Sequence, residues 1–202
     1  MLYIFLNPKK KINGSIIKLI ENANIEFDIF YPETKKDLEM LKINNKESTL
    51  LSILSKVIFP NKFLDRFKYT FNIHPGTKDY PGFGYNFALL NNAIEYGAVC
   101  HFMEEKIDSG DIILESNFVV SENESIDTLQ FKTYLHILTI LSDFLDNYKS
   151  SSLESLQKIK WTRPPYLKKD FLNTINQIND PNLKHKFTHY PDNDLPIVEK
   201  YF

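Results

Sequence analysis

The chain has one cysteine, no excess of charge of either sign and no long apolar run. Because Cys100 is the only cysteine, the chain cannot form an intrachain disulfide or a metal site with several cysteine ligands. This low cysteine content fits a reducing cytoplasm. Because 24 basic residues face 26 acidic ones, no global field favours nucleic acid or an anionic membrane as a partner. No stretch approaches the ~18 apolar residues of a membrane span. A signal peptide is not expected either, since Met1–Asn7 is typical of a strand and has no basic leader before it.

The chain also lacks the residue groups that commonly hold phosphates and metals. The glycines of Gly82-Phe83-Gly84 do not have the Rossmann or the Walker spacing. His185 and His189 are four residues apart in an irregular segment, without the acidic or cysteine company of a convincing zinc site. His136 lies in an apolar helical stretch, where a core role is expected. We therefore predict that no metal ion is needed.

What the chain does contain is an alternation of strand-like and helix-like segments, which predicts an α/β sheet with crossover helices. The Ser150–Ser152 triplet is typical of a linker, and from Trp161 to Phe202 the chain is rich in proline, aromatics and lysine and has little periodicity. The predicted strands are Leu2–Leu6, Phe27–Tyr31, Ser48–Ile58, Tyr69–His74, Ala98–Met103 and Asp111–Val120, and the predicted helices are Asn13–Asn22, Glu33–Leu41, Asn61–Phe67, Tyr85–Ile94 and Ser125–Tyr148.

Two polar side chains emerge together at the end of one predicted strand. Successive residues of a strand alternate faces, so Asn72 and His74 lie on the same side, and Pro75-Gly76 ends the strand just beyond them. Asp108 lies in a turn after the apolar segment 98–102, from which its carboxylate can reach the imidazole. Ligands of open α/β sheets bind beyond the carboxyl ends of the strands. An amide, an imidazole and a carboxylate at that place indicate an enzyme.

The Asn-x-His-Pro strand end at Asn72, together with His101 and an Asp-x-Gly at Asp108, resembles the catalytic core of the formyltetrahydrofolate-dependent formyltransferases. The resemblance covers Ser52–Phe118, and Tyr80–Ala88 looks most like the members that formylate an amino group on a nucleotide-linked sugar. The loop after His74 and a short N-terminal half depart from the common pattern. Two C-terminal segments, His185–Pro191 and Pro196–Glu199, resemble the tail of the sugar enzymes more weakly.

The resemblance implies a Rossmann-like core with a mostly parallel sheet over residues 1–149, and a short irregular extension over residues 150–202 that binds substrate or makes a dimer contact. It also implies direct transfer without a covalent enzyme intermediate. In this mechanism the amide of Asn72 donates to the oxyanion of the tetrahedral intermediate, and the imidazole of His74 serves as base or donor. Asp108 orients His74 and raises its basicity, so these three residues are the predicted catalytic set.

The same resemblance predicts two sets of binding residues. We expect N10-formyltetrahydrofolate, the formyl donor, to bind one set, and the amino sugar to bind the other. Each residue also has a plainer structural interpretation, such as a strand end, a helix start, an ordinary turn or a packed tail, and for His101 a core role is as plausible as one beside the site. The predicted folate contacts are Ser55, Lys56, Val57, Ile58, Glu105 and Ile107, and the predicted sugar contacts are Lys78, Tyr85, Asn86 and Trp161.

We therefore predict an N-formyltransferase acting on a nucleotide-linked amino deoxysugar, with dTDP as the expected nucleotide, in bacterial lipopolysaccharide O-antigen synthesis. Other formyltransferases, acting on methionyl-tRNA or glycinamide ribonucleotide, are alternatives, as are a formyltetrahydrofolate hydrolase and a non-catalytic nucleotide-sugar or folate-binding relative. The near-neutral C-terminal residues do not look like the basic domain expected of a tRNA-directed enzyme. The apolar and aromatic segment Phe187–Phe202 suggests a homodimer contact, because its exposure would be costly.

Overall fold

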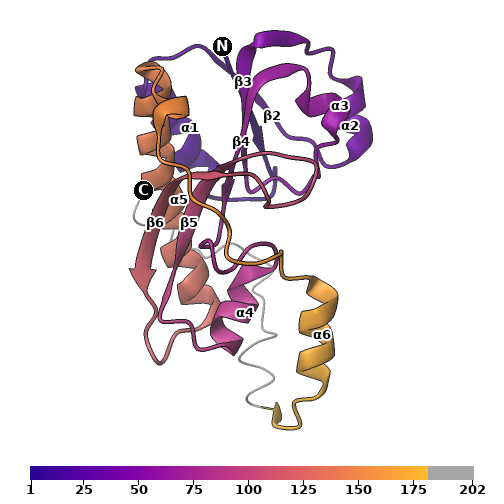
Figure 1. The fold of residues 1–202 in the computed structure, drawn as a ribbon, viewed down its shortest axis with the longest axis vertical. Helices are drawn as coiled ribbons and strands as arrows, with labels where there is room; N and C mark the ends of the chain where they lie inside the picture. Colours follow the sequence, from indigo (N-terminus) through magenta and orange to yellow (C-terminus); the bar gives the residue numbers. More distant parts are fainter. Residues whose placement is uncertain (182–202) are drawn as a thin grey trace.

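The computed structural model describes residues 1–181 and consists of one six-stranded sheet with helices on both faces (Figure 1). The strand order is β2-β1-β3-β4-β5-β6. The first four strands in this order pair in parallel, whereas β5 and β6 pair antiparallel, so the α/β class with a mostly parallel sheet is confirmed. The strands are β1 (Leu2–Leu6), β2 (Phe27–Phe30), β3 (Asn45–Ile53), β4 (Phe67–His74), β5 (Glu95–Phe102) and β6 (Ile112–Val119).

Helices α1 and α5 cover one face of the sheet, and α2 and α3 lie on the other, while α4 and α6 pack together near the start of β5 (Figure 1). The long helix α5 begins at a capping box in which Ser125 and Thr128 bond each other's backbone N–H groups. The helices are α1 (Asn13–Asn22), α2 (Lys35–Met40), α3 (Asn61–Leu64), α4 (Gly84–Leu90), α5 (Ile126–Lys149) and α6 (Lys168–Asn176), with a 3₁₀ turn at Leu153–Ser155.

Alternation along β4 decides which face carries the polar residues. Phe71 and Ile73 are fully buried in the core beneath α1 and α5. Asn72 and His74 must therefore point to the opposite face, toward the loop that follows β3. The core on that side is aromatic, with Phe5 stacked on Phe30 at 5.2 Å and in edge contact with Phe59 at 5.3 Å. Asn72 and His74 thus lie at the carboxyl end of β4, on the face of the sheet that carries this aromatic core.

The predicted third strand extends too far. It ends at Ile53 rather than Ile58, because Leu54 adopts a left-handed backbone with a φ of 54°. That conformation breaks the extended run and is costly for a branched-chain residue. The hydroxyl of Ser55 then accepts from the N–H of Val57 at 3.3 Å and closes a turn. Residues 55–58 are consequently a loop beside the polar pair, not part of the sheet.

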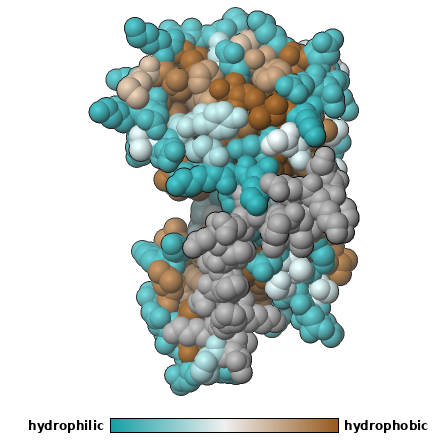
Figure 2. Space-filling model, turned by 180° about the vertical axis from the view of Figure 1, so that it is seen from behind, coloured by the Kyte–Doolittle hydropathy of each residue, from teal (hydrophilic) through white to brown (hydrophobic). Residues whose placement is uncertain are grey.

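The prediction of an irregular segment after Trp161 is wrong for residues 168–176, which form α6. Phe171 and Ile175 are four residues apart and both are buried, so one helix face packs on the core beside Phe87. The predicted dimer segment Phe187–Phe202, together with His185 and His189, lies outside the described residues. Within residues 1–181, no helix is long and apolar enough to cross a membrane. Seen from behind, the surface shows apolar patches among mainly polar side chains (Figure 2).

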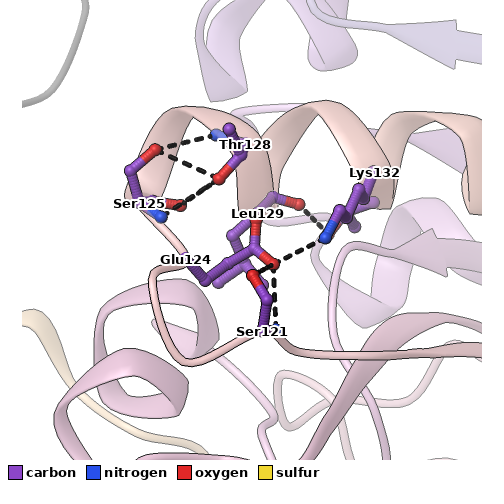
Figure 3. Close-up of polar contacts among 7 residues, drawn as sticks. Ser121, Glu124, Ser125, Thr128, Leu129 and Lys132 are labelled. Carbon is purple, nitrogen blue, oxygen red and sulfur yellow. Dashed lines mark hydrogen bonds and ion pairs between the residues drawn. The ribbon is translucent and has the colours of Figure 1, made fainter.

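A buried carboxylate joins the end of β6 to the start of α5 (Figure 3). Glu124 is only 3% exposed, and its Oε2 accepts from Lys132 Nζ at 2.6 Å and from the hydroxyl of Ser121 at 2.9 Å. Burial alone would raise the pKa of Glu124, but hydrogen bonds from Lys132, Thr128 and Ser121 lower it to about 2. The ionised carboxylate therefore stabilises this corner of the fold.

We expect Glu124→Gln to lower the free energy of unfolding by roughly 1.5 to 3 kcal/mol at pH 7, the range for hydrogen bonds to a charged group. The pKa is lower in the folded state, so the stabilisation is complete above the unfolded value of about 4.3. It is lost as the pH falls from there toward the folded pKa of about 2. Urea unfolding at pH 7 and pH 3 measures this, with the exposed Glu122→Gln as control. If both variants lose the same free energy of unfolding at pH 7, the ionised Glu124 carboxylate does not stabilise the fold as described.

Candidate active site

A row of polar side chains crosses the sheet at the carboxyl end of β3 and β4. Ser52 on β3 is the register partner of Asn72 on β4, and Asn72 is the partner of His101 on β5. Residues paired in this way project to the same face of a sheet. Because β5 runs antiparallel to β4, an imidazole from β5 lies directly beside the amide from β4. His74 lies two residues beyond Asn72 on the same face.

Asp108 completes the cluster from the turn between β5 and β6. Its backbone is left-handed, with a φ of 46°, which folds the chain back toward β4. Oδ2 lies 3.3 Å from His74 Nδ1 and accepts from the N–H of Gly82 at 2.8 Å. Oδ1 lies 3.3 Å from His101 Nε2. The buried carboxylate is thus held between two imidazoles, and the predicted contact between Asp108 and His74 is present.

His101 connects the amide to the carboxylate, a role that sequence patterns left open. Its Nδ1 lies 2.7 Å from the carbonyl oxygen of Phe102, and because a carbonyl only accepts, this nitrogen carries a proton. Nε2 of the same ring lies 3.2 Å from Asn72 Nδ2 and 3.3 Å from Asp108 Oδ1, so it bridges the amide and the carboxylate. The Asn72 amide has two hydrogens, so at least one of them is available to a ligand.

Burial and charge set the protonation states of the cluster. His74 is 6% exposed, and burial lowers its pKa below the usual imidazole value, although the Asp108 carboxylate and the Tyr80 carbonyl oppose this. Burial alone would raise the pKa of Asp108, but His74, His101 and the Gly82 N–H together lower it below its ordinary value. A neutral His74 beside an ionised Asp108 is therefore the state at neutral pH.

This arrangement leaves His74 with one free nitrogen. Nδ1 donates to the carboxylate, so Nε2 holds a lone pair, and it has no hydrogen-bond partner of good geometry among the described residues. A buried imidazole with a lone pair and a fixed tautomer is suited to accept a proton. The adjacent amide of Asn72 is suited to donate to a developing oxyanion. The cluster can therefore support attack of a nucleophile on a carbonyl.

A cavity of about 370 Å³ opens directly onto this cluster. Its walls include Asn72, His74 and Asp108 on one side. Two apolar side chains at its mouth, Ile58 and Ile107, are about half exposed although both are large and hydrophobic. The cavity brings together all of the predicted folate contacts, namely Ser55, Lys56, Val57, Ile58, Glu105 and Ile107, and their contact with a folate stays a prediction.

The predicted sugar contacts do not line this cavity. Asn86 is buried in α4 with 1% exposure, and the ring of Tyr85 contacts that of Tyr96 at 5.4 Å. Lys78 lies in the loop after β4, where its carbonyl accepts from the N–H of Thr162. Trp161 packs its ring edge-on against both histidines of the cluster. Contact of these four residues with a sugar stays a prediction.

His136 is half-buried, and its Nδ1 lies 2.8 Å from the hydroxyl of Ser116 on the face of the sheet covered by α5, away from the cavity. Cys100 is fully buried, and burial raises the pKa of its thiol, as packing rather than reactivity would require. Residues 1–181 contain no group of three or more histidine, cysteine or carboxylate side chains arranged to hold a metal ion.

The chain is similar in sequence to known formyltransferases. The sequence model of the formyl transferase family, described as "Formyl transferase", matches residues 9–137. Methionyl-tRNA formyltransferase of Fusobacterium nucleatum is 31% identical over 127 residues, which are 59% of this chain. The chain spans 40 to 54% of the length of the curated relatives that it matches.

Solved structures share the fold over most of the chain. A 4-N formyltransferase from Francisella tularensis superposes with a TM-score of 0.72 at 20% identity, covering 94% of this chain and 89% of the other. An N-formyltransferase from Helicobacter canadensis, solved with folinic acid and dTDP-3-aminofucose, gives a TM-score of 0.66 at 18% identity. That alignment covers 84% of this chain and 71% of the other.

We expect the NMR titration midpoint of His74 to lie below the usual imidazole value of about 6.5, because burial disfavours the charged ring. Asp108→Asn should lower the midpoint further, since the carboxylate is the main group that favours the imidazolium. The exposed Asp143→Asn, on α5, is the matched control and should leave the midpoint unchanged. A His74 midpoint at or above 6.5 in the wild-type protein would show that the imidazole is not desolvated as described.

Proposed function

The chain belongs to the formyl transferase family, and from this premise we propose that it moves the formyl group of N10-formyltetrahydrofolate to the amine of a nucleotide-linked amino deoxysugar. The observation that carries the proposal is the cluster of Asn72, His74 and Asp108 in the wall of the cavity. It supplies an oxyanion donor, a base and an orienting carboxylate within one small volume.

In the proposed reaction the neutral amine attacks the formyl carbon, and a new C–N bond forms. The carbonyl oxygen becomes an oxyanion, which accepts the free amide hydrogen of Asn72. Nε2 of His74 takes the proton from the attacking nitrogen, and Asp108 stabilises the resulting imidazolium. When the bond from carbon to N10 of the folate breaks, the proton passes to N10, and tetrahydrofolate leaves. No covalent enzyme intermediate is needed.

We propose that the folate occupies the cavity beside the cluster. A pterin needs backbone donors and acceptors beside apolar walls, and the loop 54–58 offers both. The half-exposed Ile58 and Ile107 at the mouth would lose solvent contact when the ligand binds, which favours occupancy. Lys56 and Glu105 then lie at the polar rim.

The sugar acceptor is supported by structural likeness over nearly the whole chain. The chain covers 89% of the Francisella 4-N formyltransferase, and the Helicobacter enzyme was solved with a dTDP-linked amino sugar. Lys78, Tyr85 and Asn86 remain the proposed sugar-side residues. With this acceptor we also propose a cytoplasmic homodimer that serves synthesis of a bacterial surface polysaccharide.

A tRNA acceptor is the second candidate, because the curated relatives are methionyl-tRNA formyltransferases. The balance of 24 basic and 26 acidic residues does not favour it, since tRNA binding draws on clustered positive charge. A hydrolase would use the same cluster with water in place of the amine, and a binding protein would hold folate without turnover.

The first functional prediction concerns the three residues. Asn72→Ala, His74→Ala and Asp108→Ala should each lower kcat by roughly 10²-fold or more, because each removes a group needed in the transition state. Their losses should not add, since the three act as a unit. Steady-state kinetics of formamide formation measures this.

The matched controls are Asn117→Ala on β6 and Asp143→Ala on α5, both exposed and remote from the cavity, and they should keep wild-type kcat. Each variant is checked for folding by circular dichroism. Near-normal turnover in any one of the three test variants removes that residue from the mechanism.

The second functional prediction concerns the acceptor. A nucleotide handle adds binding energy remote from the reacting nitrogen, which positions the amine against the formyl carbon. We expect a nucleotide-linked amino deoxysugar to have a far higher kcat/KM than the free amino sugar, glycinamide ribonucleotide or charged initiator tRNA. Measuring all four at a fixed formyltetrahydrofolate concentration decides this. Preference for either of the last two defeats the sugar assignment, and equal formate release without any acceptor indicates a hydrolase.

A further inference from the structure

A segment of the C-terminal extension, residues 159–166, contacts both histidines of the cluster, and we call it the strap. Ile159 and Ile112 exchange backbone hydrogen bonds of 2.8 and 2.9 Å, which fixes the start of the strap to β6. Its far end pairs with the loop after β4, where Phe83 N–H donates to Tyr166 O and Tyr166 N–H donates to Pro81 O, both at 3.0 Å. The strap is therefore fastened to the strand that follows the Asp108 turn and to the loop that follows His74.

Trp161, the third residue of the strap, contacts three parts of the cluster. Its ring meets that of His74 at 5.7 Å and that of His101 at 5.2 Å, in both cases edge to face. Its indole Nε1 donates to the carbonyl of Gly110 at 2.8 Å, two residues after Asp108. The indole thus contacts both imidazoles and the turn that bears the carboxylate.

The far end of the strap acts on the same carboxylate through Gly82. Gly82 donates its N–H to Asp108 Oδ2 and has a φ of 73°. A Cβ at this position would lie 2.5 Å from the carbonyl oxygen of Tyr166, so only glycine allows the strap to approach this closely. Holding Tyr166 in place therefore also holds the N–H that fixes Asp108.

Trp161 is not among the residues that line the cavity. Its ring contacts both imidazoles, and His74 and His101 are only 6% and 3% exposed. From these contacts we propose that Trp161 is a positioning residue, which holds His74, His101 and the Asp108 turn in register and keeps water away from them. The expected effect of Trp161 on catalysis rests on the proposed formyl transfer. The expected effect of Trp161 on the positions and the solvation of the histidines does not.

The test compares Trp161→Ala and Trp161→Phe with Leu172→Ala, an exposed apolar residue on α6, as control. In Trp161→Ala the catalytic side chains should be held less firmly, and a displacement of about 1 Å lowers kcat by ~10²-fold. The KM for formyltetrahydrofolate and the KM for the nucleotide sugar should both stay within about twofold of the wild-type values. Water entering the cluster should raise the ratio of formate released to formamide formed. Trp161→Phe keeps the ring but loses the bond to Gly110, so its kcat should fall less.

A second readout does not depend on activity. The ring of His74 faces Asp108, His101 and the Tyr80 carbonyl, and burial is what lowers its pKa. Admitting water in Trp161→Ala should therefore raise the NMR titration midpoint of His74 toward the usual value. If the wild-type protein fails to transfer formyl groups, this shift still supports or overturns the positioning role.

An increased KM for the nucleotide sugar with unchanged kcat would overturn the proposal and make Trp161 a substrate contact. Unchanged kcat together with an unchanged His74 midpoint would overturn it as well. If Trp161→Ala does not fold, Trp161→Phe decides, because its kcat must fall while its KM values stay near those of Leu172→Ala. Wild-type kcat in Trp161→Phe would then contradict the proposal.

Discussion

The site depends on a buried carboxylate that is held between two imidazoles. An ionised carboxylate without partners would be expensive in this interior, and Asp108 is stable there because it accepts from Gly82 and faces His74 and His101. Two residues with positive φ allow these contacts. Asp108 has a left-handed backbone in its turn, and Gly82, which donates its N–H, has a positive φ as well. In return the carboxylate fixes the tautomer of His74, so that its free nitrogen is the one that can accept a proton.

The change from parallel to antiparallel pairing explains how the cluster is assembled. Parallel pairing of β3 and β4 brings two carboxyl ends to one edge of the sheet, where the cavity lies. Antiparallel pairing of β4 with β5 then places His101 directly beside Asn72, and the β5–β6 turn returns Asp108 to the same edge. The strand pairing therefore brings all of the polar side chains of the cluster together at the end of β4.

The sequence predicted the elements that depend on local patterns and missed those that depend on distant pairing. The side on which Asn72 and His74 emerge follows from the two-residue period of a strand, and Asp108 was expected to reach the imidazole. The end of β3 at Ile53 was not predictable, because nothing in the sequence marks Leu54 as left-handed. The four-residue spacing of Phe171 and Ile175 is a signal for helix α6. This signal is weak, because the helix is short and follows a segment rich in proline. The strap could not be foreseen, since it rests on backbone pairing between Ile159 and Ile112.

The central claim is that the cavity presents a formyl group to Asn72 and His74. A crystal structure of the protein with 5-formyltetrahydrofolate, a stable isomer of the donor, tests it most directly. The claim predicts the pterin in the cavity between loop 54–58 and Ile107, with N10, the atom that carries the formyl group in the donor, directed at Asn72 Nδ2 and His74 Nε2. A folate bound elsewhere, or one whose N10 points away from both residues, would contradict it.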